Sequence, residues 1–134
     1  IDGKIKNLTL KWKKGYACNI ALASGGYPGE YEKGKVIEGV PPLLNKEGNE
    51  GRFLNSPHPD PLLVKERGND IVIFHAGTKI VRQDLTTNGG RVLGVSTTGK
   101  SLKEALDKAY AAISKISFEG MQYTKDIGKK TLEL

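Results

Sequence analysis

The sequence predicts an α+β domain: a small, β-rich unit with one long amphipathic helix over about residues 101–116. Three observations support this fold class. Apolar, β-branched runs flank an Asn-Gly-Gly turn sequence between residues 71 and 95, as in a β-hairpin. Apolar residues recur at helical spacing after a capping sequence at Ser101. A length of 134 residues with 37% hydrophobic content suits one domain with a modest core.

The N-terminal part of the chain carries short expected strands and a glycine-rich segment. Residues 8–12 alternate between apolar and polar side chains, which predicts a half-buried strand. Residues 16–23 are nearly all apolar and predict a buried strand, with Asn19 as an interruption. Residues 26–34 contain Pro and Gly, and they form either a loop pinned by tyrosines or one wall of a ligand pocket. A short strand is expected over residues 35–39.

Prolines and glycines interrupt this pattern over residues 42–69. The string Asn-Ser-Pro-His-Pro-Asp-Pro at 55–61 fits neither a helix nor a central strand, because proline lacks an amide donor and restricts the residue before it. We expect a long, flexible, exposed insertion with a short helical turn at 62–66. His58 lies in this insertion without a second metal ligand nearby in sequence, so it is assigned no metal or catalytic role.

The hairpin at residues 71–95 holds the candidate site. Gly89 and Gly90 place backbone N–H groups beside Arg91, and Lys79 stands at the far end of the first strand. Glycine amides, a guanidinium and an ammonium are groups that bind a cluster of anionic oxygens. The sequence therefore predicts a substrate phosphate site formed by Lys79, Asn88, Gly89, Gly90 and Arg91. The alternative is a turn without a ligand, because Asn and Gly both tolerate positive φ.

The clearest helix begins after Ser101. Ser101 and Glu104 form a capping box, in which the hydroxyl accepts from the N3 amide and the carboxylate reaches back. The apolar residues that follow at helical spacing should lie on the sheet; they are Leu102, Ala105, Leu106, Ala109, Ile113 and Ile116. Residues 118–123 are expected to re-enter the sheet as a short strand.

Composition limits the class of partner and compartment. The net charge of +6 favours an anionic partner, which is a phosphorylated metabolite, nucleic acid or an acidic protein. The lysines form no long basic run, so nucleic-acid binding has weak support. The single cysteine, Cys18, cannot form an internal disulfide, which favours a reducing, cytoplasmic location and a role as a small buried hydrophobe. No apolar run is long enough to span a membrane, and no signal-peptide pattern is present.

The motifs of a self-sufficient enzyme are missing from the sequence. No serine stands in a nucleophile-elbow sequence, and two histidines with one cysteine make no convincing zinc site. The glycines and lysine of residues 94–101 fail the spacing of a nucleotide-binding P-loop. His75 lies mid-strand, where we expect a structural hydrogen bond. A domain that grips the substrate of a larger enzyme would need none of this machinery.

Ordered sequence blocks resemble the C-terminal domain of glycinamide ribonucleotide synthetases, also called phosphoribosylamine–glycine ligases. The blocks are residues 25–34, 74–79, 87–95, 118–123 and 125–128. The resemblance implies a fold similar to a rudimentary barrel-sandwich hybrid. It also marks residues 42–69 as an insertion, because the family usually joins the flanking strands by a shorter turn.

The resemblance further implies a part in an ATP-grasp ligase of purine biosynthesis. In that family ATP phosphorylates the glycine carboxylate, the amine of phosphoribosylamine attacks the acyl phosphate, and Mg²⁺ (or Mn²⁺) neutralises the phosphates. The residues that hold ATP and metal lie upstream of this domain, so we expect upstream ATP-grasp domains as partners and an inactive isolated chain. Related enzymes hold ribose 5-phosphate with a Lys and an Arg on a matching hairpin, which implies Lys79 and Arg91 here. The alternative function is a small basic module that binds nucleic acid or an acidic protein.

Overall fold

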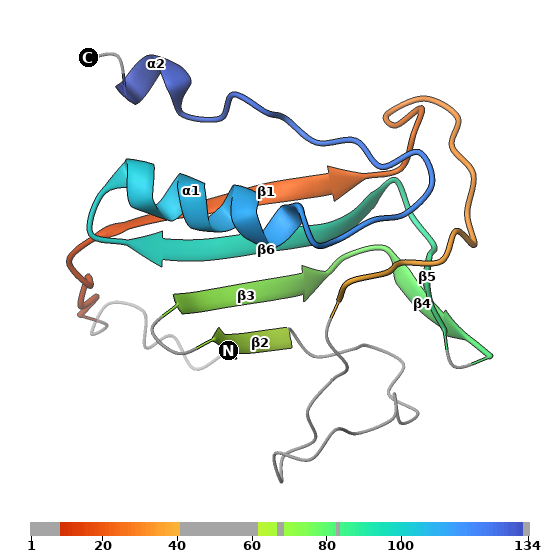
Figure 1. Cartoon of the computed structure of the whole chain (residues 1–134), viewed down its shortest axis with the longest axis horizontal. Coiled ribbons are helices and arrows are strands. Elements are labelled where there is room, and N and C mark those ends of the chain that lie inside the picture. The colour runs from red at the N-terminus through yellow and green to blue at the C-terminus, as the bar shows by residue number, and fades with distance from the viewer. Residues whose placement is uncertain (1–8, 41–61, 67–68, 83, 133–134) are drawn as a thin grey trace, which may run out of the picture.

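The protein is an α+β domain, as predicted, in which one helix crosses one face of an antiparallel sheet (Figure 1). The computed structural model describes residues 9–40, 62–66, 69–82 and 84–132. In spatial order the strands of the main sheet are β1 (Tyr16–Ala23), β6 (Arg91–Gly99), β3 (Asn69–His75) and β2 (Leu62–Glu66). A separate two-stranded sheet at one end of the domain consists of β4 (Thr78–Val81) and β5 (Asp84–Thr87).

The predicted hairpin over residues 71–95 is present, with an additional hairpin inserted into it. β3 pairs antiparallel with β6, and Ile73 lies opposite Val95. The chain between them forms β4 and β5, which pair with each other as a separate two-stranded sheet. Asn88-Gly89-Gly90 is therefore not the tip of the hairpin. It is the joint at which the chain leaves β5 and enters β6, and we call residues 88–90 the glycine joint.

The core lies between the main sheet and α1 (Leu102–Ile113). Successive strand residues point to opposite faces, so every second residue of β1, β3 and β6 faces the helix. The buried strand residues include Ile20, Leu22, Ile73, Leu93 and Val95. The helix contributes its predicted apolar stripe of Ala105, Leu106, Ala109 and Ile113. Figure 1 shows the helix lying across β1 and β6, which leaves the opposite sheet face free of α1.

The predicted capping box is formed with one difference. The Ser101 hydroxyl accepts a hydrogen bond from the Glu104 amide at 3.1 Å, as expected for an N-cap residue. The Glu104 carboxylate, however, accepts from the backbone N–H of Lys100 at 2.9 Å, one residue before the cap. The helix ends at Ile113, three residues before the predicted end, yet Ile116 is still buried in the core. A second helix, α2 (Lys129–Leu132), lies near the C-terminus.

Two local predictions from the sequence are wrong. Residues 62–66 form strand β2, not a helical turn, because this segment pairs with the otherwise open edge of β3. Residues 9–12 form no strand, and Leu10 and Trp12 are 64% and 86% exposed. An alternating pattern becomes a strand only beside a partner, and the described residues supply none there. His58 and most of the expected insertion lie outside the described residues.

The short strands expected at 35–39 and 118–123 are reduced to single bridges. Val36 bridges to Thr86, Glu38 to Ser117, and Gln122 to Ala23. These segments run along the ends of the sheets and tie the C-terminal chain to the start of the domain. The barrel-sandwich type implied by the family resemblance stays a prediction. None of the helices in the described ranges combines the length and apolar character needed to cross a membrane.

Candidate functional site

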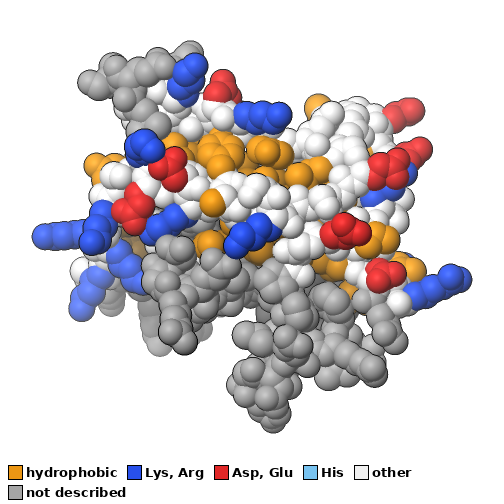
Figure 2. All heavy atoms as spheres, viewed as in Figure 1, with side chains coloured by type: hydrophobic (Ala, Val, Ile, Leu, Met, Phe, Trp, Pro, Cys, Tyr) orange, Lys and Arg blue, Asp and Glu red, His pale blue; other side chains and the backbone are white. Residues whose placement is uncertain are grey.

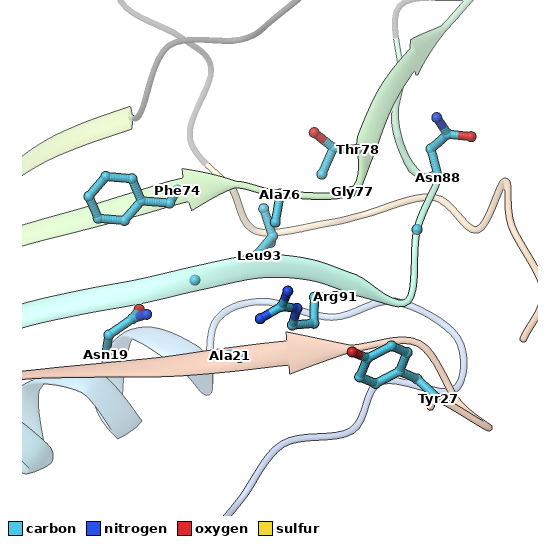
Figure 3. Close-up of a pocket in the computed structure, with 12 residues that line it drawn as sticks. Asn19, Ala21, Tyr27, Phe74, Ala76, Gly77, Thr78, Asn88, Arg91 and Leu93 are labelled. Carbon is cyan, nitrogen blue, oxygen red and sulfur yellow. The ribbon is translucent and has the colours of Figure 1, made fainter. Parts of the chain in front are cut away.

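A cavity of about 710 Å³ opens on the sheet face opposite α1, beside the glycine joint (Figure 3). Residues that line it come from β1, β3, β6 and the loops that follow β1 and β3. Its lining residues are Asn19, Ala21, Tyr27, Phe74, Ala76, Gly77, Thr78, Asn88, Gly89, Arg91, Leu93 and Gly94. Three of the five residues predicted for the phosphate site, Asn88, Gly89 and Arg91, therefore line one cavity.

Strand alternation explains why polar and small residues reach this face. Ile20 and Leu22 are fully buried on the helix side of β1. Asn19 and Ala21, which alternate with them, therefore point to the opposite face. Phe74 on β3 follows the same rule and is 43% exposed. Asn19, which interrupts an otherwise apolar run, is thus a cavity residue. Sequence reasoning did not assign it to the site, although a polar residue in such a run was the available signal.

A β-bulge aims Arg91 at the cavity. Leu22 pairs with Leu93 but the next residue, Ala23, pairs with Arg91, so β6 carries an extra residue at Val92. In an unbroken strand Arg91 would share the helix-facing side with Leu93, since residues two apart point the same way. The bulge instead buries Val92 completely and leaves Arg91 exposed on the cavity side. Bulges commonly re-aim a side chain next to a functional site.

Ser24 fixes the glycine joint from the end of β1. Its hydroxyl donates to the carbonyl of Gly89 at 2.9 Å, and its amide donates to the carbonyl of Gly90 at 2.8 Å. Ser24 is only 4% exposed. Both glycine carbonyls are thus occupied, whereas the amides of Gly89 and Gly90 donate to no acceptor within the described part of the chain. Of the two glycines only Gly89 lines the cavity, and Gly90 does not. An unclaimed amide next to a guanidinium suits an anion.

Close backbone packing explains why glycines occupy this joint. The Asn88 amide donates to the Gly77 carbonyl at 2.8 Å, and the Gly77 amide donates to the Val92 carbonyl at 3.1 Å. A Cβ on Gly77 would lie 2.8 Å from the Cα of Gly89. A side chain at Gly77 would therefore push its backbone away from that of Gly89. The glycines allow a close approach here, which is a different function from the hairpin turn considered from sequence.

Tyr27 forms the wall beside the joint. A Cβ on Gly90 would lie 2.1 Å from Cδ2 of the Tyr27 ring, so the ring rests directly on the glycine backbone. Tyr31 meets this ring edge-on, with centroids 6.2 Å apart. Of the two interpretations of residues 26–34, both hold in part: the segment is a loop with two tyrosines in contact, and Tyr27 lines the cavity. Gly90 itself is buried beneath that ring.

Lys79 is not among the residues that line the cavity. It is exposed on β4, opposite Thr86 in the β4–β5 pair. Its neighbour Thr78 does line the cavity, and adjacent strand residues point to opposite faces. Lys79 is therefore not on the cavity wall with Arg91, and a role for Lys79 stays a prediction.

His75 makes the structural hydrogen bond expected from sequence. Its Nδ1 lies 3.0 Å from the hydroxyl of Thr78. Its Nε2 is buried and has no hydrogen-bond partner among the described residues. Burial lowers the pKa of His75 below its usual value, because a charged imidazolium would lose its hydration. Burial thus favours the neutral form of His75, which does not line the cavity.

The charge around the cavity favours an anion. Arg91 is the only charged residue among the described lining residues. No described carboxylate on the cavity wall therefore repels a negative ligand. The described residues contain no group of three or more His, Cys, Asp or Glu side chains that could hold a metal ion.

Comparison with known proteins places this geometry in context. The family model described as "Phosphoribosylglycinamide synthetase, C domain" matches residues 17–130. A phosphoribosylamine–glycine ligase from Synechocystis is 38% identical over 123 residues, which cover 92% of this chain and 24% of the relative. A bifunctional purine biosynthetic protein from Dictyostelium discoideum is 39% identical over 133 residues, covering 98% of this chain and 14% of the relative.

A solved structure that resembles this chain belongs to a protein with the same name as the Synechocystis relative. The crystal structure of a phosphoribosylamine–glycine ligase from Thermotoga maritima superposes with a TM-score of 0.57 and 35% sequence identity. It covers 84% of this chain and 22% of the ligase chain. The chain thus spans only about a quarter of such ligases, or less in the Dictyostelium relative.

Proposed function

Because the chain belongs to the phosphoribosylglycinamide synthetase C-domain family, we propose that it is the C-terminal domain of a ligase that joins glycine to 5-phosphoribosylamine. The proposed product is glycinamide ribonucleotide, an intermediate of purine biosynthesis. In this proposal the domain binds the phosphate end of phosphoribosylamine and presents its amine to chemistry that takes place elsewhere in the longer protein. The names of the similar ligases support this assignment.

The single observation that supports the phosphate role is that Arg91 and Gly89, whose amide has no described acceptor, line the same cavity. The bulge turns the guanidinium into the cavity, and Ser24 occupies the carbonyls of Gly89 and Gly90. A phosphate has oxygens enough for a forked guanidinium and for separate amide donors at once. Asn88, on the same joint, is exposed and able to add its side-chain amide.

ATP and Mg²⁺ (or Mn²⁺) enter the proposal through the rest of the ligase. The described residues do not fit a metal, since they bring no set of three potential ligands together. In this proposal phosphoryl transfer takes place in the rest of the ligase. Its proposed contribution is binding and orientation of one substrate, which by itself can account for large rate effects when two reactants must meet. The expected partners are the upstream ATP-grasp domains.

A chimaeric ligase tests this function. This chain would replace the matching C-terminal region of the Synechocystis ligase, and the chimaera would be introduced into a bacterium that lacks its own ligase and requires purines. We expect growth without purines. The Arg91→Ala chimaera should raise the KM for phosphoribosylamine at least tenfold, because a charge-assisted contact to phosphate is lost. The KM values for glycine and ATP should change little.

Matched variants make the result specific. Arg82→Ala removes an arginine at the tip of the β4–β5 hairpin, outside the cavity lining, and should leave the KM unchanged. Lys79→Ala should have a smaller effect than Arg91→Ala, because Lys79 does not line the cavity. An Arg91→Ala enzyme with a normal KM for phosphoribosylamine would remove Arg91 from the proposed role.

The alternative of a basic module for nucleic acid or an acidic protein has less support. Positive and negative side chains are intermixed on the face that carries α1, as Figure 2 shows. Several described lysines are also engaged by carboxylates: Lys35 with Glu32 and Glu119, Lys103 with Asp107, and Lys108 with Glu104. Salt-dependent binding of RNA or DNA fragments by the chain would favour this alternative.

A further inference from the structure

We infer that Asn19 binds the sugar hydroxyls of the phosphorylated ligand and so distinguishes a sugar phosphate from free phosphate. This inference rests on the proposed function, because it takes the phosphate to lie at Arg91 and the glycine joint. Asn19 lines the same cavity from β1, on the opposite side of Ala21 from the joint. Phosphate binding does not account for this polar side chain in the cavity wall.

The side chain of Asn19 is oriented by its neighbour on β6. The Ser96 hydroxyl donates to Oδ1 of Asn19 at 3.2 Å. That bond occupies the carbonyl oxygen, so the Nδ2 group remains with donors that no described residue accepts. Because Asn19 lines the cavity, its N–H groups can donate to a hydroxyl oxygen of a ligand there.

The fold leaves room for this side chain and for a ligand beside it. Gly94 lies opposite Ala21 in the sheet, and a Cβ on Gly94 would come within 3.0 Å of the Asn19 Oδ1 atom. The missing side chain thus makes space for the amide. Ala21 and Gly94 together form a shallow floor between Asn19 and Arg91. Figure 3 shows the Arg91 guanidinium extending along this floor on the side toward Asn19.

The chemistry of the cavity changes along that floor. At the joint it offers the backbone of Gly89 and the Arg91 guanidinium, which suit phosphate. At the other end it offers Phe74, Ala21 and Gly94, and Asn19 is the one polar side chain in that group of lining residues. Asn19 and Ala23 are separated by about 13 Å along β1, from a rise of about 3.3 Å per residue. A sugar joined to a phosphate at the joint would extend toward Asn19, where its hydroxyls need a partner.

Titration of this chain with two ligands tests the inference. Backbone amide NMR shifts of Gly89 and Gly90 would report binding of ribose 5-phosphate and, separately, of inorganic phosphate. We expect the unmodified chain to bind ribose 5-phosphate more tightly. Asn19→Ala should weaken ribose 5-phosphate binding about three- to tenfold, the range of one neutral hydrogen bond, and leave inorganic phosphate binding unchanged. Ser96→Ala should give a smaller loss of the same kind, because it frees the amide to rotate.

Control variants separate the possible failures. Thr98→Ala alters an exposed residue on the same face of β6 outside the cavity, and should change neither affinity. Urea midpoints confirm that each variant is folded. An Asn19→Ala chain that binds both ligands normally, or loses both equally, overturns the sugar role and leaves the phosphate site standing. Equal affinity of the unmodified chain for the two ligands does the same. If Arg91→Ala leaves both affinities unchanged, or the unmodified chain binds neither ligand, the proposed function itself fails.

Discussion

The hydroxyl of Ser24 donates to the carbonyl of Gly89 at 2.9 Å, across 65 residues of sequence. This bond joins the end of β1 to the glycine joint that leads into β6. It restrains the glycine segment, because the Gly89 carbonyl cannot reorient without losing this hydrogen bond. We expect the position of the joint to depend on this long-range contact.

Ser24→Ala tests the contact. The half-buried carbonyl of Gly89 would lose its partner, which should destabilise the chain by about 1–2 kcal/mol. The joint should also become less ordered, so ribose 5-phosphate should bind more weakly. Urea unfolding and NMR titration measure the two effects. Ser114→Ala is a suitable control, because it removes an exposed serine hydroxyl that bonds only locally to Ala111. Equal stability of Ser24→Ala and the unmodified chain would argue against the role of Ser24.

Gly90→Ala should disturb the wall formed by Tyr27. The new methyl group would lie 2.1 Å from the ring in the present arrangement, so ring or backbone must move. We expect a loss of about 1–3 kcal/mol, as for other overpacking substitutions. The double variant Gly90→Ala, Tyr27→Ala should lose less than the sum of the two single losses, because the clash is relieved. Additive losses in urea unfolding would show that the contact between ring and glycine is unimportant.

His75 should make the fold less stable in mild acid. Its pKa in the folded protein is below the usual value near 6.5, so the unfolded chain takes up a proton more readily than the folded chain. The contribution of neutral His75 is complete above the unfolded pKa and declines as the pH falls below it. Protonation would also place an unpartnered donor at the buried Nε2.

The measurement compares His75→Gln with the unmodified chain. The free energy of unfolding should fall more steeply between pH 7.5 and 5.5 in the unmodified chain than in His75→Gln, which cannot take up the proton. Other titrating groups are shared by the two proteins, so only the difference between their slopes matters. Parallel pH profiles would show that His75 contributes nothing to acid sensitivity.

Ser101→Ala should weaken α1 from its N-terminus. The bond from the Glu104 amide to the Ser101 hydroxyl would be lost, at a cost of about 1 kcal/mol. Chemical unfolding monitored by circular dichroism measures this loss. Ser117→Ala, which changes an exposed serine after the helix, provides the comparison. A Ser101→Ala chain as stable as that control would mean that tertiary packing alone holds the helix.

Much of the fold followed from local patterns. The helix was predicted because capping and apolar periodicity are local properties, and its start agrees with the structure. Its end was misjudged because Ile116 is buried without being helical. Residues 62–66 and 9–12 were misjudged for a related reason. Whether a short apolar stretch becomes a strand depends on a neighbouring edge, and that edge comes from distant sequence.

The sequence by itself determined the family, the fold class and the type of residue in the joint, because motif order and side-chain chemistry are written directly in it. Tertiary structure decided which of those residues share a cavity. The bulge at Val92 directs Arg91 to the cavity, and strand alternation directs Asn19 to the same cavity. Lys79 does not line it. The physical reason is that the direction of a side chain depends on strand register, and register is set by pairing between segments far apart in the chain.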